Sequence, residues 1–320
     1  MTAHPQIFTG SAPGKVILFG EHAVVYGEPA IAVPLNSLRA TATITAAENF
    51  SESLIVDAPG IAVHARLDQL APGHPLAAAI FETMRTLNIS AAPGGTMYIE
   101  SALPAAAGLG SSAAITIAIA RALAVCFGAE LPAASAAQIA SAVEHLHHGS
   151  SSGIDPTVIA HNSALYFTKH KDPELISPHS SLKLVIADSG TTGSTRAAVN
   201  AVRLLHDDNP AHYSHIFAEI GALTASARLP LEAGQHVLLG QILNANHKLL
   251  QAIGVSTQLL DTLCAAALQA GAYGAKLTGA GTGGCMIALV DASCALSVQA
   301  ALVAAGAKFA SITALAPARP

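Results

Sequence analysis

The chain has 320 residues, of which 52% are apolar and 11% charged, and its formal net charge is −5. This length suffices for two domains, and the slight negative charge, without clustered lysines and arginines, argues against a nucleic-acid-binding surface. The sequence has no apolar run of the roughly 18 residues that a membrane helix needs, and its first residues, MTAHPQIFTG, do not form a secretory signal. We therefore expect a cytoplasmic protein that acts neither in a membrane nor on nucleic acid.

The first half of the chain predicts strands mixed with helices. β-Branched and apolar runs between turn residues predict strands at 15–19, 30–34, 40–44, 96–100 and 164–168. Helical spacing of apolar residues predicts helices at 75–87, 113–127 and 131–147, and Gly128 closes the second of them. We expect Asp155, between Gly153 and Pro156, to lie on a backbone bend outside any helix.

The polar stretch 172–181 separates the two halves, and a new strand is predicted at 183–188 (KLVIAD). After it, predicted helices lie at 197–205, 213–226, 239–253, 257–270 and 292–305, with short strands at 274–278, 286–290 and 308–312. Neither half shows a run of βαβ units, so the predicted fold class is α+β. We place the domain boundary between residues 182 and 183, which gives domains 1–182 and 183–320.

The strongest local motif is PAAAGLGSSAA, at residues 104–114. Its glycines let the backbone approach an anion closely, and the helix after it offers unpaired N–H groups and the positive end of its dipole. Ser111 and Ser112 add hydroxyls that can cap the helix, bind phosphate or ligate Mg²⁺. The motif matches neither a Walker loop nor G-x-G-x-x-G. Taken alone, it predicts either a phosphate-binding loop or a helix cap without a ligand.

Three segments together resemble the GHMP kinase superfamily, which includes galactokinase, homoserine kinase, mevalonate kinase and phosphomevalonate kinase. They are SAPGKVILFGEHAVVYG (11–27), the loop at 104–114, and KLTGAGTGGC (276–285). The resemblance implies transfer of the γ-phosphoryl group of ATP to a small molecule. It also implies an N-terminal ribosomal-protein-like α+β domain with the ATP and Mg²⁺ site and the catalytic aspartate. The C-terminal domain would be ferredoxin-like and α+β, with the substrate side and the glycine-rich loop.

Further segments resemble the mevalonate kinases within that superfamily. EHLHHGSSSGID (144–155) is similar to their E-x-x-x-H-G-x-P-S-G-x-D, and DSG (188–190) followed by GSTR (193–196) is similar to their substrate-side segment. Two positions depart from the pattern, since Ser151 stands where Pro is usual and Asn162-Ser163 where Gly-Gly is usual. The resemblance implies phosphorylation of mevalonate to 5-phosphomevalonate on the route to isoprenoids.

The resemblance also implies roles for individual residues. Asp155 would be the catalytic base or the group that orients the substrate hydroxyl, and Lys15 would contact Asp155 and the phosphoryl region. Ser112 and Glu144 would bind Mg²⁺, which prefers hard oxygen ligands. The residues implied to contact ATP are Lys15, Ser101, Ala107, Gly108, Leu109, Gly110, Ser111 and Ser112. Those implied to contact the substrate are Glu21, His22, Asp155, Thr195 and Gly281.

Two of these roles have alternatives. Glu21 would accept a hydrogen bond from a substrate hydroxyl, whereas His22 either recognises a carboxylate or hydroxyl or is a structural histidine. The glycines of 279–284 either approach a ligand closely or only brace the phosphate loop.

Other functions remain alternatives. One is another kinase of the superfamily, acting on phosphomevalonate or on a different hydroxyl of mevalonate. A phosphomonoester would need extra basic residues, and Arg196 is the only obvious candidate. The other is a non-catalytic sensor of ATP and a metabolite, which the presence of Lys15, Glu144 and Asp155 disfavours. The sequence leaves open whether the chain forms a homodimer.

Cysteine and histidine spacing favours no metal site. The four cysteines lie far apart without a C-x-x-C pair, so we expect reduced and mostly buried thiols. His145, His147 and His148 form a tight cluster, but on a helix only His145 and His148 share a face. We therefore favour structural roles over zinc for these histidines.

Overall fold

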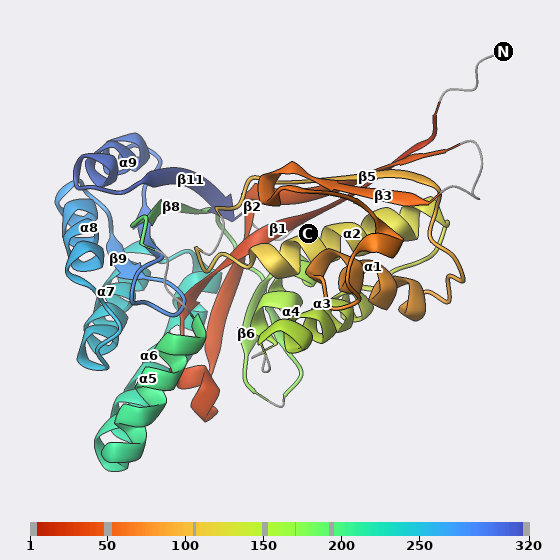
Figure 1. Cartoon of the computed structure of the whole chain (residues 1–320). Helices are drawn as coiled ribbons and strands as arrows, with labels where there is room; N and C mark the ends of the chain where they lie inside the picture. Colours follow the sequence, from red (N-terminus) through yellow and green to blue (C-terminus); the bar gives the residue numbers. More distant parts are fainter. Residues whose placement is uncertain are drawn as a thin grey trace. The chain divides into compact units, whose positions relative to one another are not determined.

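The computed structural model describes residues 5–47, 53–104, 107–148, 153–169, 171–191 and 195–315 (Figure 1). The chain divides into two compact units, each built from three segments. The first unit comprises Met1–Gly14, Leu38–Pro104 and Gly110–Asn162, and the second comprises Lys15–Ser37, Ala105–Leu109 and Ser163–Pro320. Helices and strands occur in both units, which confirms the predicted α+β class. The single domain boundary at 182/183 stays a prediction.

The first sheet has the strand order β4-β3-β5-β2-β6-β7, with β1 also paired to β2. Its strands are β1 (Ile7–Phe19), β2 (Ala30–Ala46), β3 (Leu54–Ala58), β4 (Val63–Arg66), β5 (Gly95–Ser101), β6 (Ala164–Phe167) and β7 (Glu174–Ile176). The pairing of β3 with β5 is parallel, whereas β2 is antiparallel to both β5 and β6. The two strands predicted at 30–34 and 40–44 are one continuous strand, so the chain passes from the second unit to the first within β2.

Four helices of the first unit lie on one side of β3 and β5 (Figure 1). They are α1 (Pro75–Thr86), α2 (Ser111–Cys126), α3 (Ala133–His148) and α4 (Ile154–His161). α2 contacts the other three helices, and it approaches β1 so closely that a Cβ on Gly10 would lie 2.2 Å from the nitrogen of Ala122. Arg121 of α2 donates to the carbonyls of Ser11 (2.7 Å) and Ala160 (2.8 Å). The helix that follows the phosphate loop is therefore firmly placed within its unit.

The second unit contains an antiparallel sheet in the order β11-β8-β10-β9. Its strands are β8 (Leu182–Asp188), β9 (Gly274–Leu277), β10 (Cys285–Val290) and β11 (Phe309–Leu315). Its helices are α5 (Thr195–Asp208), α6 (Pro210–Ala233), α7 (His236–Ala252), α8 (Gln258–Gln269) and α9 (Ala295–Ala304). α8 contacts β9 and β10, while α9 contacts β8 and β11. α7 lies along β9, where the Asn244 Oδ1 accepts a hydrogen bond from the Ala275 N–H (2.9 Å).

Two other expectations concern the chain as a whole. All four cysteines are free, with Cys264 and Cys285 buried and Cys126 and Cys294 half-buried. Within the described residues, no helix combines the length and apolarity needed to cross a membrane.

Candidate active site

Residues 107–110, the described part of the predicted phosphate loop, lead directly into α2. Gly108 and Gly110 both have φ = +76°, a left-handed conformation that glycine adopts without steric cost. Gly110 is the N-cap of α2, and Ser111 and Ser112 form its first turn. The first N–H groups of a helix have no acceptor within it, so this turn can bind an anion. The predicted combination of a glycine loop and a helix start is therefore present.

Lys15 is joined to the phosphate loop through its backbone. Its N–H donates to the carbonyl of Leu109 at 2.9 Å, and both residues are buried. Lys15 lies in β1, so the strand of the first motif supports the loop of the second. Residues far apart in the sequence are thus held together within the second unit.

The third motif, the loop at 278–284, also contacts both of the others. The Thr278 hydroxyl accepts from the Ile17 N–H (3.1 Å) and donates to the Ile17 carbonyl (2.9 Å). A Cβ on Gly279 would lie 3.8 Å from the carbonyl oxygen of Gly108, and one on Gly284 would lie 3.5 Å from that of Ala107. The loop therefore lies next to the phosphate loop, and both alternatives for its glycines, close approach to a ligand and bracing of that loop, stay predictions.

The same loop contacts the substrate-side segment that follows β8. The Gly284 N–H donates to the Thr191 carbonyl (2.8 Å), and the Ser189 N–H donates to the Gly284 carbonyl (2.9 Å). Gly281 is needed for packing, since a Cβ there would lie 2.2 Å from the Val255 carbonyl oxygen. Thr195 is exposed at the start of α5.

Glu21 and Lys276, which precedes this loop in β9, form a fully buried ion pair. The Lys276 ammonium donates to Oε1 of Glu21 and to the carbonyl of Leu277 (2.7 Å). Burial raises the pKa of Glu21 and lowers the pKa of Lys276, because desolvation outweighs the attraction between the partners. Removing one member of such a pair generally costs about 3–5 kcal/mol.

The sequence motifs assign no role to Lys276. The signal that would have found it is a lone lysine in the otherwise apolar strand GAKL. Because this lysine engages Oε1 of Glu21, one oxygen of a predicted substrate-binding carboxylate is already occupied within the protein.

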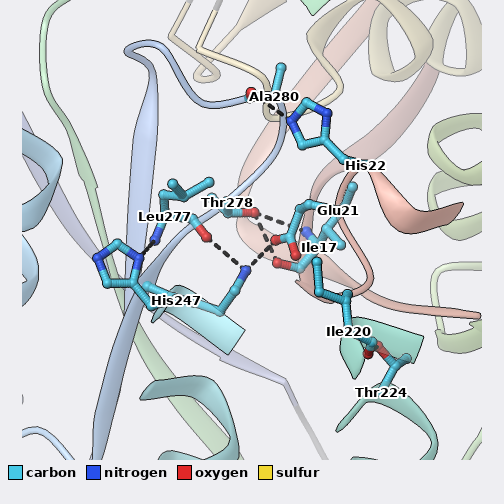
Figure 2. Close-up of polar contacts among 10 residues, drawn as sticks. Ile17, Glu21, His22, Ile220, Thr224, His247, Leu277, Thr278 and Ala280 are labelled. Carbon is cyan, nitrogen blue, oxygen red and sulfur yellow. Dashed lines mark hydrogen bonds and ion pairs between the residues drawn. The ribbon is translucent and has the colours of Figure 1, made fainter. Parts of the chain in front are cut away.

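His22, the neighbour of Glu21, is also buried, and a ring nitrogen, Nε2, lies 2.8 Å from the Ala280 carbonyl oxygen (Figure 2). Burial lowers the pKa of His22. A neutral imidazole that donates from Nε2 to this carbonyl accounts for both observations.

The remaining predicted residues belong to the first unit. Ser112 is exposed in the first turn of α2, Glu144 is half-buried in the last turns of α3, and Asp155 is half-buried in α4. These three helices contact one another. Ser101 is exposed at the end of β5, where its hydroxyl accepts from the Leu103 N–H at 3.2 Å.

The expectation that Asp155 lies outside a helix is wrong. It is the second residue of α4, which begins after Gly153, a residue with φ = +79°. Pro156 is compatible with this position, because the first turn of a helix needs no N–H donor. Asp155 therefore lies at a helix N-terminus, whose dipole favours a carboxylate. Ser151, Gly193 and Ser194 belong to the segments that resemble the mevalonate kinases. They lie outside the described residues.

Comparisons with known proteins agree with this arrangement. Residues 75–163 match the family described as GHMP kinases N terminal domain, and residues 227–308 match GHMP kinases C terminal. A mevalonate kinase of Thermococcus sibiricus is 40% identical over 295 residues, covering 87% of this chain and 88% of that protein. One from Pyrococcus abyssi is 38% identical over 303 residues and covers 89% of each.

A crystal structure of L. major mevalonate kinase in complex with R-mevalonate is similar to the whole chain. Its TM-score is 0.85 at 27% identity, and the match covers 100% of this chain and 99% of that one. The two domain matches, the curated relatives and this structure all lead to one assignment. The chain belongs to the GHMP kinase family, on its mevalonate kinase branch.

Proposed function

We infer that this chain phosphorylates mevalonate, using ATP as the phosphoryl donor and yielding 5-phosphomevalonate. The observation that carries the inference is that the parts of the three sequence motifs in the second unit lie next to one another. The backbone of Lys15 bonds to Leu109, and the loop at 278–284 contacts both β1 and the phosphate loop. The relatives at 38–40% identity are mevalonate kinases, which supports mevalonate over the other acceptors of the superfamily.

ATP binding is assigned to the loop and to the start of α2. The left-handed Gly108 and Gly110 shape the loop, and the N–H groups and hydroxyls of Ser111 and Ser112 would bind a phosphate at the helix N-terminus. Lys15 supplies a positive charge for the phosphates, and Ser101 contributes a hydroxyl on the nucleotide side. The assigned contacts also include Ala107 and Leu109.

Ser112 and Glu144 are the proposed holders of Mg²⁺. A hydroxyl and a carboxylate are hard oxygen donors of the kind that Mg²⁺ prefers, so the donor chemistry fits. When bound, the ion would neutralise charge on the phosphates. Ser112 is exposed and Glu144 is half-buried.

Asp155 is the proposed catalytic carboxylate, which orients the acceptor hydroxyl and takes its proton. It lies in the first turn of α4, directly after Gly153. Lys15 stabilises the charge that develops on the transferred group. Glu21, His22, Thr195 and Gly281 are assigned to the acceptor side.

A coupled ADP-release assay with four acceptors tests the function. We expect turnover with mevalonate and none above the ATPase background with phosphomevalonate, homoserine or galactose. Phosphorus NMR of the product then identifies the phosphorylated hydroxyl. Turnover confined to another acceptor would reject the inference. Binding of ATP and mevalonate by titration calorimetry, without turnover, would instead indicate a sensor.

A further inference from the structure

The backbone at His22 adopts a strained turn. His22 has φ = +61° and ψ = −49°, a region that residues with a side chain rarely occupy. The Ala23 N–H donates to the Glu21 carbonyl at 2.7 Å, which closes a three-residue γ-turn centred on His22. This form of the γ-turn, with positive φ at its centre, is the rare and strained one. Such a conformation persists only where the surrounding structure enforces it.

Two side-chain links enforce the turn, one from its first residue, Glu21, and one from its central residue, His22. The Glu21 carboxylate is paired with Lys276, and the His22 ring is bonded to the Ala280 carbonyl (Figure 2). Both links lead to the same stretch of the second unit, the end of β9 and the glycine-rich loop. Thr278, between the two anchor points, ties that stretch to Ile17 of β1.

Lys276 is itself rigidly held. It pairs with Ile287 of β10 in the antiparallel register, and its ammonium also donates to the Leu277 carbonyl at 2.7 Å. The Leu277 N–H in turn donates to Nδ1 of His247 on α7 (3.4 Å). The ammonium is therefore held between the Glu21 carboxylate and the Leu277 carbonyl.

Stability alone does not account for this pair. Replacing a buried ion pair by well-packed apolar residues is often neutral or stabilising, because both charges must be desolvated. In addition, Oε2 of Glu21 is buried and has no hydrogen-bond partner among the described residues. One oxygen of the Glu21 carboxylate is thus paired and the other is not, and the carboxylate adjoins a strained turn. This combination indicates that the ion pair serves to hold the backbone conformation at His22.

We propose that Lys276 is a positioning residue, which holds the γ-turn at His22 through Glu21 and so shapes the acceptor side of the site. The proposal rests on the proposed function in placing His22 on that side. In this account Glu21 acts on the acceptor through the turn and does not need to touch it.

The test compares Lys276→Met with the double variant Glu21→Gln/Lys276→Met, and with Lys248→Met as the control. Lys248 is an exposed lysine on α7, so the control makes the same change outside the pair. The double variant removes both buried charges at nearly constant volume, and it is the informative variant if Lys276→Met alone fails to fold. The readouts are the melting temperature, KM for mevalonate, KM for ATP, and hydrogen exchange at the Ala23 amide.

We expect both Lys276 variants to raise KM for mevalonate by about tenfold or more, the scale of loss from a misplaced contact, with KM for ATP changed less than about threefold. The Ala23 amide should exchange about tenfold faster or more in both, while the amides of β10 keep their protection. The double variant should have a higher melting temperature than Lys276→Met, because the double variant leaves no unpaired buried charge.

A double variant with wild-type KM and wild-type exchange at Ala23 would overturn the proposal, since the pair would then serve only stability. The proposal would also be overturned if the β10 amides exchanged faster by the same factor as the Ala23 amide, because the substitution would then act through global unfolding. If the wild type lacks activity on mevalonate, the proposed function fails, and exchange at Ala23 still decides whether Lys276 holds the turn.

Discussion

The residues assigned to the reaction occupy two different kinds of environment. In the first unit, Ser112, Glu144 and Asp155 lie near helix ends and are exposed or half-buried. In the second unit, Glu21 and His22 are buried, and each is bonded to the stretch 276–280. Groups near helix ends can be exchanged at little cost to folding, whereas buried paired groups cannot. Substitutions of Ser112, Glu144 and Asp155 should therefore affect mainly activity, whereas substitutions of Glu21 and His22 should affect activity and stability together.

The largest effect is expected at Asp155. Asp155→Asn keeps the volume but removes the charge and the proton acceptor, so kcat should fall by about 10²-fold or more, the range for a positioned acid–base group. The melting temperature and KM for ATP should change little, because the side chain is half-buried at a helix start. Nearly normal turnover would remove Asp155 from the reaction. Glu21 would then be a poor substitute, since it is fully buried and paired with Lys276.

A companion variant tests whether Lys15 serves the same transition state. Lys15→Met should also lower kcat, and the double variant with Asp155→Asn should be scarcely worse than the poorer single variant. Because Lys15 is buried, its variant should also melt at a lower temperature, unlike Asp155→Asn. Additive losses in log kcat would show that the two residues act independently.

The next effect concerns Gly110. Gly110→Val should raise KM for ATP by about 100-fold, because a β-branched residue resists φ = +76° and would distort the backbone between the loop and α2. Gly128→Val is a matched control at the other end of α2, where φ is +61° and a Cβ meets no atom within 4 Å. Both variants should lose similar stability. Normal ATP affinity in folded Gly110→Val would mean that the glycine is only a helix cap.

A smaller effect, which depends on the Mg²⁺ concentration, is expected at Glu144. Glu144→Gln should reduce turnover by about tenfold or more at limiting Mg²⁺, since an amide is a weaker ligand than a carboxylate, and added Mg²⁺ should restore part of the loss. Glu130→Gln, at an exposed site, is the control. Mg²⁺ titrations of kcat measure the difference. Identical Mg²⁺ dependence in the two variants would exclude Glu144 as a ligand.

The sequence predicted most of the long helices and strands but missed several short ones. The helix at 75–87 was predicted from its helical spacing of apolar residues, and the helices at 113–127 and 131–147 and the strand at 183–188 from their apolar runs. The short strands β3, β4 and β7 were missed, since three to five residues give no clear period. α4 was missed because Gly153 and Pro156 indicate a break in most contexts, whereas here they begin a helix.

The candidate site divides in a similar way. Motifs identified the residues that carry chemistry, such as Lys15 and the glycines of the phosphate loop. They gave no sign that Lys276 would pair with Glu21, because the partners are 255 residues apart in sequence and meet only after folding. Contacts of this kind depend on tertiary packing, which local patterns do not encode.

The smallest expected effect lies at Asn162, one of the two departures from the mevalonate kinase pattern. Asn162 is the C-cap of α4 with φ = +50° and ψ = +40°, a left-handed conformation that asparagine tolerates better than other residues with a side chain, and glycine best of all. Asn162→Gly should therefore change the free energy of unfolding by less than about 0.5 kcal/mol, while Asn162→Ala should lose about 1 kcal/mol.

Urea unfolding measures the difference between the two Asn162 variants, and kcat should stay within about twofold of the wild type in the glycine variant. Asn162 and Asp155 lie at opposite ends of the same short helix. A glycine variant that is stable but has lost turnover would show that the asparagine side chain acts on the reaction, and the contrast between the two units would need revision. An alanine variant as stable as the wild type would show that α4 can end without the left-handed residue.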